Sequence, residues 1–386
     1  MKIVNFLSGL GACALSRIMP GKKADKTVMY PEEDRLWEAL YQRYCDNNGP
    51  RITAIGGGTG LAMLLRGLKK YSANLSAIVN VTDDGGSSGR LRENLDMLPP
   101  GDIRNCLLAL ADTEPLLEKV FHYRFTAGEG LEGHNLGNLF LAALTEQFGF
   151  EGAIIAASKV LAVKGDVLPV TLAKLNLVAL FTNGCEVYGE SQIPLQRGRI
   201  ARLRLEPETS SVYPAAEQAI RDAEIVVVGP GSLYTSILAN LLVPGVSRAI
   251  RESSARKVYI CNVMTQPGET DGLSAADHLQ VIYDHVGPDL FDTVIVNNSP
   301  QIPQAILEKY LHEGSSPVVP DTARLRKMGV NIVAADLLSP NELVRHNPDR
   351  LAHLVLQQFT TFREKGVSAF SGNYEFEEGR GKGCAS

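Results

Sequence analysis

The sequence lacks the features that mark a disulfide-rich domain, a structural zinc site or a membrane protein. Only 6 of its 386 residues are cysteines, and they form no C-x-x-C pair and no histidine–cysteine cluster with zinc-like spacing. No uncharged apolar stretch approaches the ~20 residues that a membrane-spanning helix needs. These absences are typical of a protein in a reducing compartment, and we expect a cytoplasmic location.

An excess of positive charge is also missing. The chain has 38 basic and 43 acidic residues and a net charge of -5, so its bulk charge does not attract a nucleic-acid backbone or an anionic membrane. We therefore expect no nucleic-acid partner. The length is sufficient to bury a large apolar core, which excludes a small stapled scaffold.

Residues 1–50 are expected to form an N-terminal extension, because β-rich segments begin only near Arg51. Within this extension, residues 3–16 are uncharged, follow Lys2 and end in Ala12-Cys13-Ala14, which resembles the end of a signal peptide. The alternative is a helix that lies on the surface.

From residue 51 to residue 365, short β-rich segments alternate with helical patterns, as in a parallel sheet covered on both faces. We predict an α/β protein with a doubly wound, Rossmann-like, mostly parallel sheet. The expected strands are residues 52–55, 75–81, 177–182, 225–228, 257–261, 293–296 and 331–333. The expected helices are residues 61–70, 103–111, 136–148, 234–242, 275–285, 303–311 and 350–363.

Three segments depart from this alternation. Residues 102–163 contain consecutive helical patterns with little strand between them and are expected to be a helical insertion. Residues 167–171 and 186–192 are expected to form a small antiparallel edge unit. Residues 366–386 are expected to be a disordered tail, since their Gly- and charge-rich sequence offers little apolar surface to offset ordering entropy.

A glycine-rich loop follows the first expected strand and opens the first expected helix. Its sequence is Gly56-Gly57-Gly58-Thr59-Gly60, which fits neither G-x-G-x-x-G nor a Walker A loop. Such a loop brings backbone N–H groups and the positive end of a helix to an anion, usually a phosphate. The alternative is a tight turn without a ligand.

A second polar loop follows the second expected strand and includes Asp83, Asp84, Ser87, Ser88 and Arg90. Carboxylates at this end of a sheet accept ribose hydroxyl groups or hold a divalent cation, and a Gly-Gly-Ser-Ser-Gly segment supplies further donors. The two aspartates are therefore candidates for sugar or metal binding. The alternative is that they cap a helix or solvate a turn.

Two helix starts add further candidate ligands. Asp102 is placed as the N-cap of one helix, with Arg104 and Asn105 in its first turn. His134, Asn135 and Asn138 lie within one turn at the start of the other. His134 considered alone is better explained by a structural role.

The later strands also end in polar loops. Gly229, Gly231 and Ser232 open a helix after the fourth strand of the expected sheet, and Asn262 and Thr265 follow the next strand. Ligands of doubly wound sheets bind outside the carboxyl ends of the strands. A long polar site of this kind favours a ligand with two phosphates and sugar hydroxyl groups, such as a nucleotide-sugar.

No catalytic nucleophile is recognisable. The sequence has no G-x-S-x-G elbow, no H-E-x-x-H motif and no evident catalytic Cys/His pair. The functions that remain are phosphoryl or nucleotidyl transfer, which needs no protein nucleophile, and binding without turnover. The broken glycine motif argues against a third class, the dinucleotide-dependent oxidoreductases.

The motifs VNVTDDGGSSGRLR and VGPGSLYTSI, with the other loops in the same order, resemble the YvcK (GlmR) group of gluconeogenesis factors in the CofD-like superfamily. The resemblance extends over about residues 51–362. It implies a Rossmann-like fold, a homodimer, and a regulator that binds UDP-sugars such as UDP-N-acetylglucosamine. Such a regulator connects carbon metabolism with cell-wall precursor synthesis and cell shape, with protein partners in that synthesis and no cofactor needed for binding.

The resemblance also implies roles for individual residues. The glycines and Thr59 would lie at the nucleotide phosphates, Asp83 and Asp84 near sugar or metal, and Asn262 and Thr265 along the ligand. Tyr310 and Arg345 match a tyrosine and an arginine that the regulators use on the UDP-sugar.

The same superfamily includes 2-phospho-L-lactate transferase, which moves a phospholactyl group from a nucleotide-linked donor with Mg²⁺. A transferase of this type is the alternative function.

Overall fold

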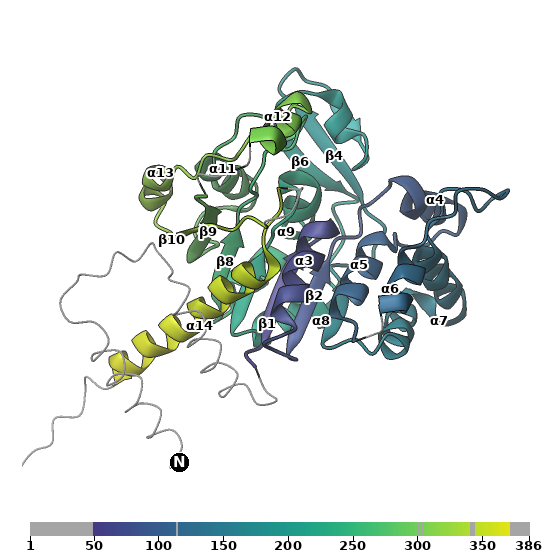
Figure 1. The fold of residues 1–386 in the computed structure, drawn as a ribbon, viewed down its shortest axis with the longest axis horizontal. Coiled ribbons are helices and arrows are strands. Elements are labelled where there is room, and N and C mark those ends of the chain that lie inside the picture. Colours follow the sequence, from purple (N-terminus) through teal and green to yellow (C-terminus); the bar gives the residue numbers. More distant parts are fainter. Residues whose placement is uncertain (1–48, 113–114, 300–301, 303, 340–343, 371–386) are drawn as a thin grey trace, which may run out of the picture.

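The computed structural model describes residues 49–112, 115–299, 302, 304–339 and 344–370. In this part of the chain, parallel strands form a seven-stranded sheet in the order β10-β9-β8-β7-β1-β2-β3 (Figure 1). The strands are β1 (Ile52–Gly56), β2 (Leu75–Val79), β3 (Asp166–Pro169), β7 (Ile225–Val228), β8 (Arg256–Ile260), β9 (Thr293–Asn297) and β10 (Asn331–Ala335). The predicted doubly wound α/β class is confirmed.

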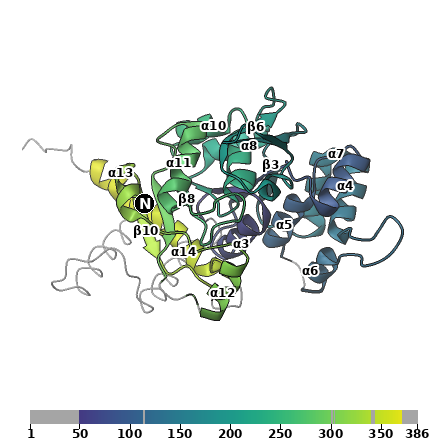
Figure 2. The ribbon, with the colours of Figure 1, turned by 90° about the horizontal axis from the view of Figure 1, so that it is seen from above.

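Helices cover both faces of this sheet, as Figure 2 shows from above. One apolar cluster joins the sheet to α3, α5 and α14, and a second joins the opposite face to α8, α10 and α11. The helices are α3 (Gly58–Leu68), α4 (Gly86–Asn94), α5 (Gly101–Leu110), α6 (Pro115–His122), α7 (Leu136–Val160), α8 (Pro214–Asp222), α9 (Ala239–Leu241), α10 (Val246–Glu252), α11 (Ala275–Val286), α12 (Gln304–His312), α13 (Thr322–Lys327) and α14 (Pro348–Phe370).

Strand β1 illustrates why these sequences form central strands. Ile52 and Ala54 pack into the cluster on the α3 face, whereas Ile55 packs into the cluster on the other face. Thr53, also buried, donates from its hydroxyl to the Ala219 carbonyl oxygen at 2.7 Å. Since both faces are covered, the strand consists almost entirely of apolar residues rather than alternating with polar ones.

The order of the strands creates a switch point between β1 and β7. The chain runs from β1 to β2 on one side, and later from β7 outward through β8, β9 and β10 on the other. The loops after β1 and β7 therefore diverge from adjacent strand ends. This is where open α/β sheets bind their ligands.

The second, three-stranded sheet corrects the strand prediction. β4 (Asn176–Phe181) is antiparallel to β5 (Glu186–Tyr188) and β6 (Ile200–Glu206), in the order β5-β4-β6. Residues 177–182 therefore do not belong to the parallel sheet. Residues 167–171, predicted to form an antiparallel unit with 186–192, instead overlap the parallel edge strand β3, Asp166–Pro169. The short, Pro-ended β3 has the composition of an edge strand, while the apolar β4 has that of a central one.

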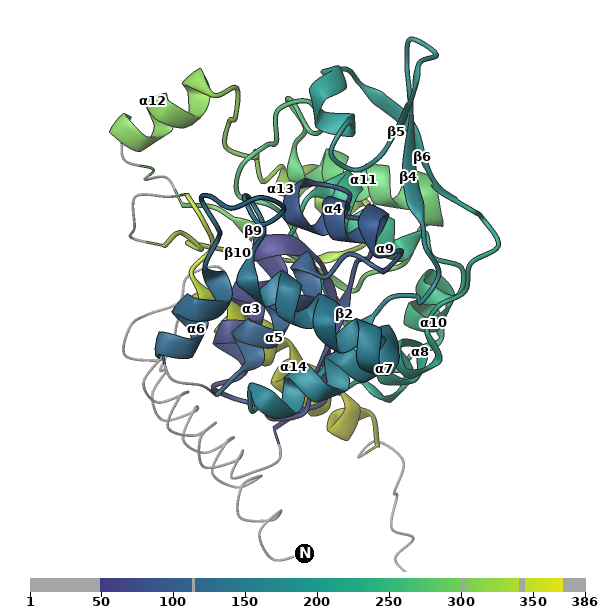
Figure 3. The same cartoon turned by 90° about the vertical axis from the view of Figure 1, so that its right-hand side faces the viewer.

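Helices α4 to α7 lie together on one side of the molecule (Figure 3). Helix α7 is long and apolar enough to cross a membrane by composition alone. Its backbone leaves the helical conformation at Gly149 (φ 71°, ψ 169°), so it consists of two helical pieces.

The ends of the described chain adjust two predicted boundaries. The carbonyl oxygens of Gly49 and Pro50 accept hydrogen bonds from Asn74 and Ser72, so packing begins before residue 51. Helix α14 continues past residue 366 to Phe370. The signal-like segment and residues 371–386 lie outside the described residues.

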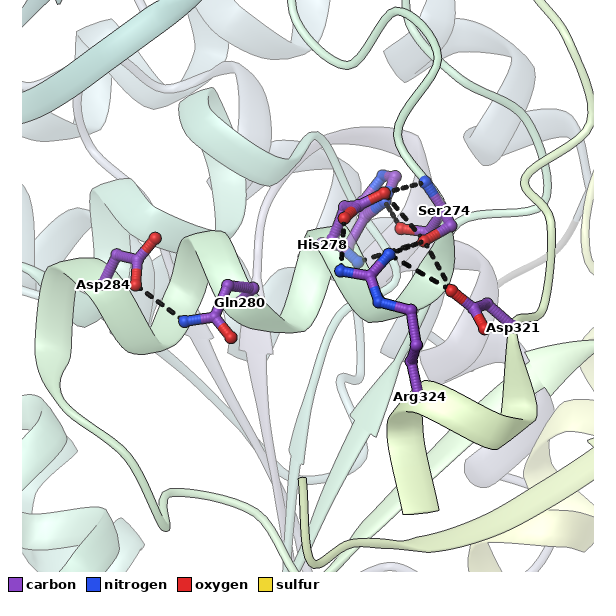
Figure 4. Close-up of polar contacts among 7 residues, drawn as sticks. Ser274, His278, Gln280, Asp284, Asp321 and Arg324 are labelled. Atoms are coloured by element: carbon purple, nitrogen blue, oxygen red, sulfur yellow. Dashed lines mark hydrogen bonds and ion pairs between the residues drawn. The ribbon is translucent and has the colours of Figure 1, made fainter. Parts of the chain in front are cut away.

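The far edge of the sheet is fixed by a capping box at the start of α11. Ser274 and Asp277 bond reciprocally, and the Arg324 guanidinium of α13 donates to Asp277 at 2.9 Å and pairs with Asp321 at 3.2 Å (Figure 4). These contacts join α13 to α11, which stabilises the connection into β10.

We predict that Gly67→Ala destabilises the fold, because a Cβ atom there would lie 2.2 Å from the Pro348 carbonyl oxygen where α3 crosses α14. Overpacking of this kind costs about 1–3 kcal/mol. Urea unfolding measures it. The matched control is Arg66→Ala on the same helix, whose half-exposed pair with Glu118 contributes less than about 1 kcal/mol. Equal stability of the two variants would contradict the prediction.

Candidate functional site

Two glycine loops touch at the switch point of the sheet. A Cβ atom on Gly60, in the first turn of α3, would lie 2.4 Å from the Pro230 carbonyl oxygen in the loop after β7. Gly58 has a φ of +61°, a conformation that glycine adopts without strain. The sequence therefore needs glycine at both positions, one for space and one for backbone conformation.

Two asparagines fix these loops. Asn240 donates from its amide nitrogen to the carbonyl oxygens of Gly56 (2.9 Å) and Ser236 (2.7 Å). Asn262 accepts from the Gly231 N–H (3.2 Å) and donates to the Gly231 carbonyl oxygen (2.7 Å). Asn262 thus lies next to the second glycine loop. Asn240 was missed, although a buried asparagine in an apolar helical segment was the signal for it.

A buried glutamate joins the loop after β7 to the loop after β8. Ser232 donates from its hydroxyl to the Glu269 carboxylate, and Thr235 donates to the Ser232 oxygen at 2.7 Å. Burial raises the pKa of Glu269. Glu269 was missed because nothing in its local sequence distinguishes it from a surface glutamate.

The loop after β8 also connects to α12. The Thr265 hydroxyl accepts from the Ser316 N–H at 2.9 Å, and the Ser315 N–H bonds to the carbonyl oxygen of Tyr310 at 2.8 Å. The Tyr310 hydroxyl in turn accepts from the Val344 N–H at 3.2 Å. Thr265 and Tyr310 therefore belong to one connected wall. The exposed Arg345 directly follows Val344 in the chain, so it lies at the same wall.

The predicted second loop is largely a helix. Residues Gly86–Asn94 form α4, and Ser87 and Ser88 are buried within it rather than open to a ligand. Before α4, Asp83 accepts from the Gly85 N–H at 3.0 Å and Asp84 accepts from the Ser191 N–H at 2.8 Å. The helix was missed because two glycines and two serines have low helix propensity.

Asp102 has a different role from the predicted N-cap. The cap residue is Pro100, and Asp102 is the second residue of α5. Its carboxylate lies against the first glycine loop: a Cβ atom on Gly57 would be 2.6 Å from Asp102 Oδ2, and the Gly58 N–H bonds to the same carboxylate. Burial, followed by repulsion from Asp83, raises the pKa of Asp102 to about 6.

A further carboxylate, Glu190, comes from the segment after β5. It accepts from Thr82 at 2.6 Å and from the amide of Asn80 at 3.1 Å, and burial raises its pKa well above the usual range. Asp102, Asp83 and Asp84 add to this by repulsion. Glu190 was missed because the groups that it contacts, Asn80 and Thr82, lie 110 and 108 residues away in the sequence.

The predicted metal role of Asp83 or Asp84 finds limited support. Within the described residues, no group of three or more His, Cys, Asp or Glu side chains is arranged to hold a metal ion. A Mg²⁺ ion usually binds through one or two carboxylates and the phosphates of a substrate. Asp83 and Asp84 fit only a Mg²⁺ ion that is coordinated jointly by protein carboxylates and by the phosphates of a substrate.

The remaining predicted residues gather around Ser87. Its hydroxyl lies 3.1 Å from His134 Nδ1 and accepts from the Asn135 N–H and the Asn138 amide, both at 3.2 Å. Arg104 donates to Asn138 Oδ1 at 2.5 Å and to Asn105 Oδ1 at 2.8 Å. His134 is buried with its Nδ1 beside the Ser87 hydroxyl, which matches the structural role considered for it.

The predicted site residues therefore divide into two groups. The first surrounds the glycine loops and includes Asp83, Asp84, Asp102 and Asn262. The second surrounds Ser87 and includes His134, Asn138 and Arg104. Helix α5 carries one member of each group: Asp102 belongs to the first and Arg104, two residues later, to the second.

Comparison with known proteins places this arrangement in a family. The family model described as 2-phospho-L-lactate transferase CofD matches residues 52–338. A gluconeogenesis factor from Halalkalibacterium halodurans is 48% identical over 308 residues, covering 79% of this chain and 95% of that protein. A gluconeogenesis factor from Bacillus subtilis is 48% identical over 309 residues, covering 80% and 97%. A crystal structure of a UPF0052 family member from Bacillus halodurans superposes with a TM-score of 0.78 at 47% identity, covering 80% of this chain and 99% of that one.

We predict that Asp102→Asn stabilises the protein above pH 6. The carboxyl group has a higher pKa in the fold than in the unfolded chain, so it favours the fold when protonated and loses that contribution as pH rises from about 4 to about 6. The shift corresponds to about 2–3 kcal/mol at neutral pH.

Urea unfolding of both proteins at pH 4 to 8 measures this difference. The gain from the amide should be present at pH 7 and vanish near pH 4. Asp112→Asn, at an exposed aspartate paired with Lys164, is the control and should show no such gain. A gain independent of pH would contradict the prediction.

Proposed function

The chain belongs to the CofD family and to its gluconeogenesis factors, and from that premise we propose that it binds a UDP-sugar, with UDP-N-acetylglucosamine as the expected ligand. In this proposal it is a regulatory protein rather than an established enzyme. It connects carbon metabolism during gluconeogenic growth with cell-wall precursor synthesis and cell shape. We propose a cytoplasmic homodimer that acts on protein partners in that synthesis.

The contact between the two glycine loops is the observation that carries the proposal. Gly60 lies against Pro230 and Gly57 lies against Asp102, whereas a Cβ atom on Gly58 would meet nothing within 4 Å, so the backbone is open at Gly58. The N-terminus of the 11-residue helix α3 lies at the same place. Backbone N–H groups at a helix N-terminus are suited to the diphosphate of a nucleotide-sugar.

The neighbouring polar groups suit the rest of such a ligand. Asn262, Ser232 and Thr265 provide amide and hydroxyl groups on the loops after β7 and β8. Carboxylates such as Asp83 accept hydrogen bonds from sugar hydroxyl groups. Tyr310 and Arg345 belong to the wall that continues from these loops.

A phospholactyl-type transferase is the second candidate, favoured by the name of the family model. Its chemistry would use a nucleotide-linked donor and a Mg²⁺ ion held between Asp83 or Asp84 and the donor phosphates. A requirement for Mg²⁺ in binding and turnover distinguishes it, since the regulator needs no cofactor to bind.

We predict that UDP-N-acetylglucosamine raises the melting temperature and is recovered unchanged. A ligand that binds only the native state at a hundredfold excess over Kd contributes about 2.7 kcal/mol. Thermal shift with UDP-N-acetylglucosamine, NAD and NADP measures binding. Chromatography after incubation with the UDP-sugar, or with a guanosine-linked phospholactyl donor, Mg²⁺ and a deazaflavin acceptor, measures turnover. Turnover of the phospholactyl donor and the deazaflavin acceptor would contradict the proposal that the protein is a regulator.

We further predict that Gly58→Val abolishes this protection, because valine strains a backbone with φ of +61° and covers the N–H group. Gly329→Val is the matched control: φ there is +82°, a Cβ atom would meet nothing within 4 Å, and the position is in the turn before β10. Isothermal titration of both variants with the UDP-sugar tests this. Undiminished affinity in Gly58→Val would remove the loop from the site.

A further inference from the structure

Three arginines from three separate segments donate hydrogen bonds to residues around the start of α7. Arg90 lies on α4, Arg104 on α5, and Arg124 in the segment between α6 and α7. The Arg124 backbone is held by a β-bridge to Asn135. Arg124 donates to the Gly133 carbonyl oxygen at 2.6 Å, and Arg90 donates to the adjacent Glu132 carbonyl oxygen at 2.7 Å. These two guanidinium groups therefore flank one turn.

Arg104 forms the inner member of this arginine cluster. It is half-buried, whereas Arg90 and Arg124 are exposed. Its two terminal nitrogens donate to the amide oxygens of Asn138 and Asn105, and its Nε is buried with no hydrogen-bond partner. A buried N–H group without a partner is costly. The cluster thus has an inner donor that is not satisfied by the protein.

The charge of the cluster is not balanced by ion pairs. In the described part of the chain, no carboxylate lies within ion-pair distance of these three guanidinium groups, although other arginines such as Arg324 and Arg350 have such partners. Their hydrogen bonds go to neutral oxygens. Burial and then repulsion from Arg124 lower the pKa of Arg104 to about 10, and Asp102 and Asp83 offset this only in part. Burial, with Arg90 and Arg124, also lowers the pKa of His134.

We propose that Arg90, Arg104 and Arg124 bind the phosphate group of a second ligand, a small phosphorylated metabolite, next to the nucleotide-sugar. Three guanidinium groups match the two charges and three oxygens of a phosphate monoester better than the single charge of a carboxylate. Arg104 is two residues from Asp102, which lies against Gly57, so the first turn of α5 would stand between the two ligands. That this site is separate from the nucleotide site rests on the proposed function.

Inorganic phosphate is the probe for this site. Thermal shift of the full chain is recorded against phosphate concentration, with ionic strength held constant by NaCl and with acetate as the carboxylate probe. We expect saturable stabilisation by phosphate and at least tenfold weaker apparent binding of acetate. Arg104→Gln and the exposed Arg124→Gln should each weaken phosphate binding at least tenfold.

Arg202→Gln is the matched control, since Arg202 is also exposed and donates to a backbone carbonyl, that of Asp284. Equal loss in this variant, or no loss in Arg124→Gln, would overturn the proposal. Arg124→Gln keeps the test valid if Arg104→Gln fails to fold.

A second titration is made in the presence of saturating UDP-N-acetylglucosamine. Continued phosphate binding supports a separate site, whereas mutual exclusion would assign the arginines to the nucleotide diphosphate and overturn the proposal. If the UDP-sugar does not bind at all, the proposed function fails. The arginine variants still decide the phosphate site in that case, because their readout uses phosphate alone.

Discussion

The close approach of two backbones at Gly60 and Pro230 is the constraint on which the site depends. It is allowed because β1 and β7 are adjacent in the sheet and because Gly60 has no side chain. It brings the N-terminus of α3 beside the loop after β7. Asn240 and Asn262 then hold each loop by its backbone, so the N–H groups keep fixed directions before any ligand arrives. A prearranged site loses less conformational entropy on binding.

The first turn of α5 separates two regions of opposite charge. Asp102 faces the glycine loops with Asp83 and Glu190, and Arg104 faces Asn138 and the other arginines. Both groups are partly withdrawn from water, and each experiences repulsion from its own kind. The pKa of Asp102 is raised and that of Arg104 is lowered for this reason as well as by burial. Such like-charge groups at the edge of a sheet are more typical of binding sites than of a protein core.

The sequence was most informative where local pattern and tertiary position agree. The strands β1, β2, β7, β8, β9 and β10 are apolar segments followed by polar loops. The glycine loops open helices as predicted, α3 after the first loop and a π-helix, Leu233–Leu238, after the second. The small sheet was placed wrongly because β4 has the composition of a central parallel strand. Helix α4 was missed because its serines form hydrogen bonds with Asn138 and the Asn135 backbone, which local propensity does not include. Glu190, Glu269 and Asn240 become site residues only through contacts between distant segments.

Asp102 shows how the same residue type at the same position can serve a different purpose. An aspartate after Pro-Pro-Gly fits an N-cap, yet the structure places the cap at Pro100 and directs the carboxylate to Gly57 and Gly58. There it accepts from the Gly58 N–H, which is the kind of donor that a phosphate would use. The carboxylate therefore satisfies this N–H group, and the hydrogen bond lowers the pKa of Asp102, whereas burial and repulsion from Asp83 raise it. A diphosphate that approaches this loop meets an acid already in place, so binding requires that Asp102 shifts, takes up a proton or shares a cation with the ligand.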